Sequence, residues 1–171
     1  MNNTTNNQNN PRLKKQGGFT LIELSIAIAI IGVLVAVIMQ AREGVTYQRK
    51  QDFLIKQTQT ITAATDRWQK GRPNKTGVSM SVLCAVGSKL LDDTMCGATK
   101  DGKKSNAFGG DITVAANTTN PSLVDISFTA LPSDYITDLA DTLAPMTNGR
   151  CQTATGCASL VVTGTGIKAT M

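Results

Sequence analysis

The chain has 171 residues, a formal net charge of +5 and a hydrophobic share of 41%, and it contains no histidine. A chain of this length holds one domain of ordinary size plus an appendage. Without histidine it lacks the side chain that most often serves as a general base and as a zinc ligand. We therefore expect a protein that is not an enzyme, has no metal centre and needs no cofactor.

The excess positive charge is concentrated at the N-terminus. Arg12, Lys14 and Lys15 are the charged residues among the first 18, and the rest of the chain is almost balanced. A nearly balanced body has no bulk electrostatic attraction for nucleic acid. The short basic run at residues 100–104 is typical of a solvated loop, so we expect no nucleic-acid partner.

A nearly unbroken apolar run begins at Phe19 and ends at Met39. It is long enough to span a bilayer as a helix, and it exceeds the apolar region of about 7–15 residues found in a secretory signal peptide. One acid, Glu23, lies near its start, where burial in lipid costs about 2.5–3.5 kcal/mol or more. A plain membrane anchor does not explain this acid.

Residues 14–39, KKQGGFTLIELSIAIAIIGVLVAVIM, resemble the class III signal of type IV pilins and related pseudopilins. Gly18 stands at the position before the cleavage point, Phe19 at the new N-terminus and Glu23 at the acid position of that family. The resemblance implies that a prepilin peptidase cuts between Gly18 and Phe19 on the cytoplasmic face and methylates the Phe19 amine.

The resemblance also implies three segments. Residues 1–18 form a leader that is removed, residues 19–43 a transmembrane and filament-core helix, and residues 44–171 a globular head. The basic leader keeps the N-terminus in the cytoplasm by the positive-inside rule. The precursor is therefore expected in the inner membrane with its head outside the cytoplasm, and the mature chain in a cell-surface pilus.

Cleavage suggests what offsets the buried carboxylate. The new amine of Phe19 in one subunit pairs with Glu23 of another inside the apolar core, where a charge pair penalises the wrong register. The partners that the resemblance implies are further copies of the chain, the peptidase, a cytoplasmic assembly ATPase, an inner-membrane platform protein, an outer-membrane secretin where a second membrane exists, and membrane lipid before assembly.

Beyond the apolar run, helical periodicity continues to about residue 70. Side chains at alternating steps of four and three form one face, namely Leu54, Thr58, Ile61, Thr65 and Trp68. Gly71 and Pro73 follow as a standard helix stop. Residues 74–110 read as a connecting region with a short helix inside 78–91.

After residue 108 the apolar period changes to two. Strands are predicted at 112–114, 124–128 and 160–162, and a helix at 134–143 with Ser133 as its N-cap. These elements predict an α+β fold, in which a long N-terminal helix, half transmembrane and half amphipathic, packs on a small antiparallel sheet. The family resemblance implies the type IV pilin fold.

Two further stretches resemble the type IVb, or PilS-like, branch of the pilins. They are Asn106–Ile112, NAFGGDI, and residues 126–133, ISFTALPS. That branch usually places a cysteine just after the Pro-Ser pair, where this chain has Tyr135. Phe19 also differs from that branch, because phenylalanine is the mature N-terminal residue typical of type IVa pilins.

The four cysteines, Cys84, Cys96, Cys151 and Cys157, all follow the apolar run. This places them on the oxidising side of the membrane, where disulfides form. Neither pair has the C-x2–4-C spacing of a zinc site. The simplest pairing is Cys84 with Cys96 and Cys151 with Cys157, although four cysteines allow three pairings.

The function expected from these features is that of a structural pilus subunit for adhesion, aggregation, motility or conjugation. The alternatives are a type II secretion pseudopilin and a minor or DNA-uptake pilin. A carboxylate cluster for calcium near the C-terminus would favour the major pseudopilin, and residues 142–171 contain no acid.

Overall fold

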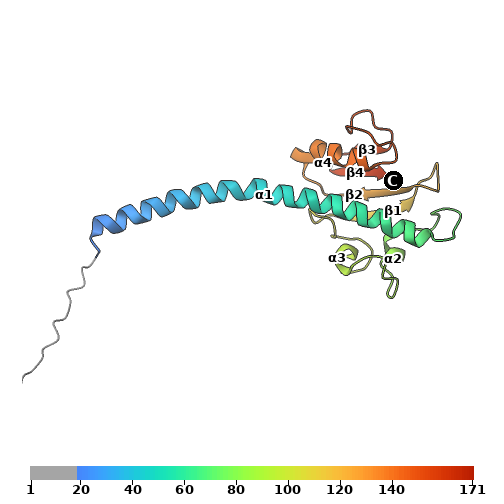
Figure 1. Cartoon of the computed structure of the whole chain (residues 1–171), viewed down its shortest axis with the longest axis horizontal. Coiled ribbons are helices and arrows are strands. Elements are labelled where there is room, and N and C mark those ends of the chain that lie inside the picture. Colours follow the sequence, from blue (N-terminus) through green and yellow to red (C-terminus); the bar gives the residue numbers. More distant parts are fainter. Residues whose placement is uncertain (1–18) are drawn as a thin grey trace, which may run out of the picture. The chain divides into compact units, whose positions relative to one another are not determined.

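The computed structural model describes residues 19–171, with the side chains of all of these except residues 40–44. The chain divides into two compact units between Glu43 and Gly44. The first contains the start of a long helix, and the second contains the helix end, a sheet and several short helices (Figure 1). The predicted α+β fold with a long N-terminal helix is confirmed.

Helix α1 runs from Leu21 to Gln69. Its segment Leu21–Met39 has a mean hydropathy of 2.9 and is exposed on every side, and it is the one part of residues 19–171 long and apolar enough to cross a membrane. A helix that is apolar all round needs either lipid or other helices around it. This segment fits membrane anchoring.

The second unit is built on the amphipathic end of α1. The predicted face is confirmed: Leu54, Thr58, Ile61 and Thr65 are buried, and Trp68 is half-buried. The two buried threonines donate to the α1 carbonyls of Leu54 and Thr62 at 2.9 and 2.8 Å. Their hydroxyls are thereby satisfied without leaving the helix.

Four antiparallel strands form one sheet, in the order β1-β2-β4-β3. They are β1 (Ile112–Ala116), β2 (Val124–Phe128), β3 (Leu160–Thr163) and β4 (Gly166–Thr170). Alternate residues face the core, which the sheet shares with Leu54, Ile61 and Ala64 of α1. Three of these strands were predicted. The fourth, β4, was missed because Ile167-Lys168-Ala169 is too short an alternation to stand out.

The short helices correct two expectations. The helix predicted inside 78–91 is one turn, α2 (Met80–Leu83), and Val86 beyond it is 91% exposed. Ser133 makes no capping bond, because a 3-10 turn, η1 (Ser133–Tyr135), precedes α4 (Ile136–Leu143). The remaining elements are α3 (Asp93–Cys96) and η2 (Ala144–Met146).

Candidate functional site

Of the residues predicted to act in processing and assembly, the structure describes Phe19 and Glu23. Gly18, Arg12, Lys14 and Lys15 lie outside the described residues. Phe19 precedes α1 and is 82% exposed. Glu23 is the acid of the first turn of α1 and is also exposed.

Thr20 caps the start of α1, which the sequence analysis missed. Its Oγ1 accepts from the Glu23 N–H at 3.2 Å, and its carbonyl accepts from the Leu24 N–H at 3.1 Å. The T-L-I-E sequence fits the capping-box pattern, in which the acid lies three residues after the cap. Glu23 therefore has a local role at the positive end of the helix dipole, in addition to any role between subunits.

The Glu23 carboxylate forms no salt bridge with the side chains that the structure describes, those of residues 19–39 and 45–171. Farther along α1, beginning six residues after Glu23, a hollow of about 300 Å³ lies between Ala29, Ile30, Val33 and Leu34. Small residues on an apolar helix let a second helix approach closely. An exposed acid on such a helix is suited to contact a cation carried by a neighbouring helix.

In the head unit, α4 is fastened to α1 by a cluster around Asp138. The Tyr47 hydroxyl donates to Asp138 Oδ2 at 2.6 Å, and Gln51 Nε2 donates to the same oxygen at 3.2 Å. The rings of Tyr47 and Tyr135 stack at 4.2 Å. Burial, and then the hydrogen bond to Asp138, raise the pKa of Tyr47 well above its usual value, so its hydroxyl remains a donor.

Tyr47→Phe removes one donor and leaves Gln51 bonded to Asp138, so we expect the free energy of unfolding at pH 7 to fall by about 1 kcal/mol. The raised pKa of Tyr47 also fixes a pH dependence. The Tyr47 contribution is complete below pH ~10, where an unfolded tyrosine ionises, and is lost as the pH rises toward the folded pKa.

Urea unfolding in mild detergent at pH 7 and at pH ~11 measures both effects. Wild type should lose more stability than Tyr47→Phe between these values, and Tyr135→Phe should behave as wild type. Equal losses in wild type and Tyr47→Phe would contradict the role of this hydrogen bond.

Residues 105–110 are held to the head by two buried amides. Gln57 of α1 donates to the Ser105 carbonyl at 2.6 Å and accepts from the Ala107 N–H at 3.1 Å. Asn106 Oδ1 accepts from Phe108 and Gly110 N–H at 2.8 and 2.9 Å, and its Nδ2 donates to the Thr129 carbonyl at 2.7 Å. The stretch that resembles the PilS-like branch therefore has a structural role, because its hydrogen bonds fix it to α1 and to the end of β2.

The structure bonds Cys84 to Cys96 and Cys151 to Cys157. The first bridge lies between α2 and α3, with both cysteines buried. The second closes a loop before β3, where the Ser159 hydroxyl donates to Thr147 Oγ1 at 2.7 Å and lies 3.3 Å from Cys157 Sγ.

Loss of the Cys84–Cys96 bridge should destabilise the head more than loss of Cys151–Cys157. The two bridges join cysteines 12 and 6 positions apart. A disulfide stabilises the fold by lowering the conformational entropy of the unfolded chain, by about 3 kcal/mol for the longer loop. Each doubling of loop length adds about 0.6 kcal/mol to this stabilisation. Paired Cys→Ser variants compared by urea unfolding test this. A larger loss from the shorter loop would contradict it.

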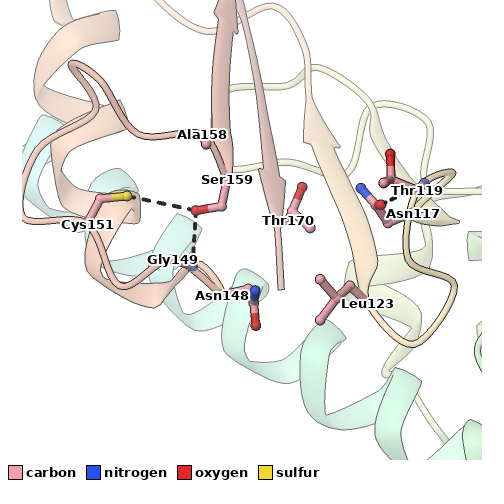
Figure 2. Close-up of a pocket in the computed structure, with 9 residues that line it drawn as sticks. All are labelled: Asn117, Thr119, Leu123, Asn148, Gly149, Cys151, Ala158, Ser159 and Thr170. Carbon is pink, nitrogen blue, oxygen red and sulfur yellow. Dashed lines mark hydrogen bonds between the residues drawn. The ribbon is translucent and has the colours of Figure 1, made fainter.

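An open pocket of about 500 Å³ lies between the β1–β2 turn and the second disulfide loop (Figure 2). Figure 2 shows Asn117 and Leu123 on one side, and Asn148 and Ser159 on the other. No charged side chain lines it. Because Ser159 already donates to Thr147, its hydroxyl serves the loop structure.

Two lysines of the basic run form ion pairs with nearby aspartates. Lys100 and Lys103, from the basic run, contact Asp93 and Asp101 at 2.9 and 3.2 Å. Within residues 19–171, no group of three or more Cys, Asp or Glu side chains is arranged to hold a metal ion.

A family model described as the prokaryotic N-terminal methylation motif matches residues 13–39. The match contains the expected cleavage point, the expected methylation site and Glu23. Comparison of the chain with curated proteins and with solved structures found no match. The recognised similarity is therefore confined to the segment that carries Phe19 and Glu23, and it points to a structural rather than an enzymatic protein.

Proposed function

We propose that this chain is a structural subunit that polymerises into a type IV pilus. The methylation motif at residues 13–39 and the α+β fold support a type IV pilin-like or pseudopilin precursor. The observation that carries the proposal is the apolar segment of α1. It is exposed all round, begins with an acid and is joined to a packed head. Such a segment is suited to two environments, the bilayer before assembly and a bundle of like helices afterwards.

The first proposed step is removal of residues 1–18. The peptidase cuts after Gly18 and methylates the amine of Phe19, whose side chain is exposed. The product has a positive amine four residues before Glu23, just outside the capped start of α1. Residues 19–43 then form the filament core and residues 44–171 the head.

The second proposed step is addition of subunits in one register. A subunit leaves the bilayer when its apolar segment packs among those of earlier subunits, and its Glu23 meets the Phe19 amine of a neighbour. Identical head-to-tail contacts that do not close into a ring produce a helical filament. The pairing offsets the cost of placing a carboxylate in an apolar core.

The proposal extends to location and partners. The precursor lies in the inner membrane with its N-terminus in the cytoplasm, and the polymer lies on the cell surface, where it serves adhesion, aggregation, motility or conjugation. An assembly ATPase, a platform protein and, where present, a secretin act with it. The two stretches around Asn106 and Phe128 favour the type IVb branch.

Replacing the residue before the cleavage point tests the proposal. In Gly18→Val cells we expect the unprocessed chain to stay in the membrane and surface fibres of this chain to disappear, because a branched side chain directly before the proposed cleavage point would obstruct the cut. The matched variant Gly17→Val should be processed. Mass spectrometry of the membrane fraction measures the retained leader, and normal fibres from Gly18→Val would overturn the proposal.

A further inference from the structure

The turn between η2 and the second disulfide loop contains the only asparagine of the chain that is followed by glycine, Asn148-Gly149. The turn is closed by Arg150 N–H, which donates to the Thr147 carbonyl at 2.8 Å. In an Asn-Gly pair the backbone nitrogen of the glycine can attack the side-chain carbonyl carbon of the asparagine, since glycine has no Cβ to obstruct the approach. The pair is therefore a reactive feature that the proposed function does not use.

The side chain of Asn148 is free to react. Its backbone N–H donates to the Thr170 carbonyl at 2.8 Å, which ties the turn to the end of β4. Its side-chain amide is exposed and bonds to none of the groups that the structure describes. In Figure 2 the amide lies beside the pocket, and no dashed line reaches it. The carbonyl carbon is therefore accessible, and no hydrogen bond holds the amide nitrogen in place.

The attacking nitrogen, by contrast, is held by a serine. Gly149 N–H donates to Ser159 Oγ at 3.1 Å (Figure 2), and a Cβ on Gly149 would lie 2.6 Å from the same oxygen. Ser159 is itself fixed, because it donates to Thr147 Oγ1 at 2.7 Å and Thr147 donates to the Ala144 carbonyl at 2.8 Å. The nitrogen must give up its hydrogen before it attacks, so a bond that holds this hydrogen slows the attack.

The one Asp-Gly pair of the chain, Asp101-Gly102, could form the same cyclic product but is held at both ends. Asp101 Oδ1 accepts from the Thr99 hydroxyl and from Lys103 N–H, and Gly102 N–H donates to the Cys96 carbonyl at 2.9 Å. The hydrogen bond from Thr99 lowers the pKa of Asp101, and an ionised carboxylate is a poor target for attack. Of the two pairs, only Asn148-Gly149 has an unbonded side chain.

We propose that Asn148 is a site of spontaneous deamidation in the folded head, and that the bond from Gly149 N–H to Ser159 Oγ limits its rate. The Gly149 nitrogen loses its proton to hydroxide and forms a bond to Asn148 Cγ. The Cγ–Nδ2 bond then breaks, and Nδ2 takes a proton from water and leaves as ammonia. Water opens the resulting succinimide at either carbonyl and gives aspartate or isoaspartate. Overall one water is consumed and one ammonia is released, without an oxidant or a reductant.

The reaction changes this part of the surface in two ways. Either product places a carboxylate at the pocket of about 500 Å³, whose lining is uncharged. Isoaspartate also adds one carbon atom to the backbone of the turn, which then cannot keep both the bond from Arg150 to Thr147 and the bond from Gly149 to Ser159. Because the reaction needs only water, the modified fraction grows with the age of the head. This inference goes beyond the proposed function, since a head that never polymerises would react as well.

Incubation of the full mature chain in mild detergent and mildly alkaline buffer tests the proposal. Samples taken over time are digested and mapped by mass spectrometry, with fragmentation that separates aspartate from isoaspartate. Wild type should convert Asn148, while Asn106 and Asn117, whose amides are bonded, stay intact. Ser159→Ala should convert Asn148 about fivefold faster, because the attacking nitrogen loses its hydrogen bond.

Thr147→Val is the matched control. It removes the hydroxyl that bonds to Ser159 but leaves the bond from Gly149 to Ser159, so its rate should stay within about twofold of wild type. If Ser159→Ala does not fold, wild type decides: the folded chain should convert Asn148, but more slowly than the urea-unfolded chain. No conversion in folded wild type while the unfolded chain reacts, equal rates in wild type and Ser159→Ala, or equal acceleration by Thr147→Val would overturn the proposal.

Discussion

Cells that carry Glu23→Gln are expected to export no filaments of this chain, although the subunit is made, processed and inserted. Glutamine keeps the shape of the side chain and removes its charge, so the Phe19 ammonium of the neighbouring subunit would enter the apolar core without a counter-ion. Breaking a buried ion pair in this way costs about 3–5 kcal/mol. Repeated at every subunit, this cost is large enough to stop polymer growth.

The capping role of the first turn of α1 provides the control. Thr20→Ala removes the oxygen that accepts from the Glu23 N–H and costs about 1 kcal/mol of helix stability, but it leaves the carboxylate in place. We expect Thr20→Ala cells to form filaments. Glu23→Asp, which keeps the charge on a shorter side chain, should give an intermediate number.

Electron microscopy of surface filaments, with immunoblots of membrane and sheared fractions, separates the two roles of Glu23. If Thr20→Ala and Glu23→Gln are equally defective, the acid acts through the helix start. If both variants form normal filaments, the pairing of Glu23 with the Phe19 amine is wrong.

Gly110→Ala is expected to destabilise the head by more than about 3 kcal/mol or to prevent its folding. A Cβ at Gly110 would overlap the Thr129 carbonyl oxygen and would also lie 2.8 Å from Asn106 Nδ2. Both atoms belong to the hydrogen bond that holds the 105–110 segment to the end of β2. The methyl group has no room unless this bond breaks and leaves buried polar atoms unpaired, which adds to the cost.

The neighbouring glycine is a matched control. Gly109 has φ +87° and no atom within 4 Å of a Cβ, so Gly109→Ala pays only the backbone cost of about 1–2 kcal/mol. Urea unfolding of both variants in mild detergent measures the difference. Equal losses would mean that the Thr129 contact does not constrain this segment.

Periodicity predicted the parts of the fold that depend on neighbouring residues. Leu54, Ile61 and Thr65 were assigned to the buried face of α1 from their spacing alone, and they are buried. The alternation in β2 was long enough to predict a strand. By contrast, β4 has only two core residues, Ile167 and Ala169. This segment forms a strand because it pairs with β2 on one side and β3 on the other.

Contacts between distant residues were not predictable. Gln57 reads as a polar helix residue, yet it is buried because Ser105 and Ala107, some 50 positions away, supply its hydrogen-bond partners. The bond from Tyr47 to Asp138 likewise joins residues 91 positions apart. No local sequence pattern indicates these contacts, because the residues come together only when the chain folds.

The candidate site was more accessible to sequence reasoning. Glu23 stood out because an acid is costly in an apolar run, and Phe19 and Gly18 followed from the resemblance. The cap at Thr20 was missed, although its T-x-x-E spacing is a known pattern.

The N-terminus of the chain in sheared surface fibres tests the central claim most directly. Fibres collected from the cell surface, dissociated and analysed by mass spectrometry should contain this chain as a main component, beginning at Phe19 and carrying one methyl group on its amine. A chain that begins at Met1, or that is absent from surface fibres while the mature form stays in the membrane, would contradict its assignment as a pilus subunit.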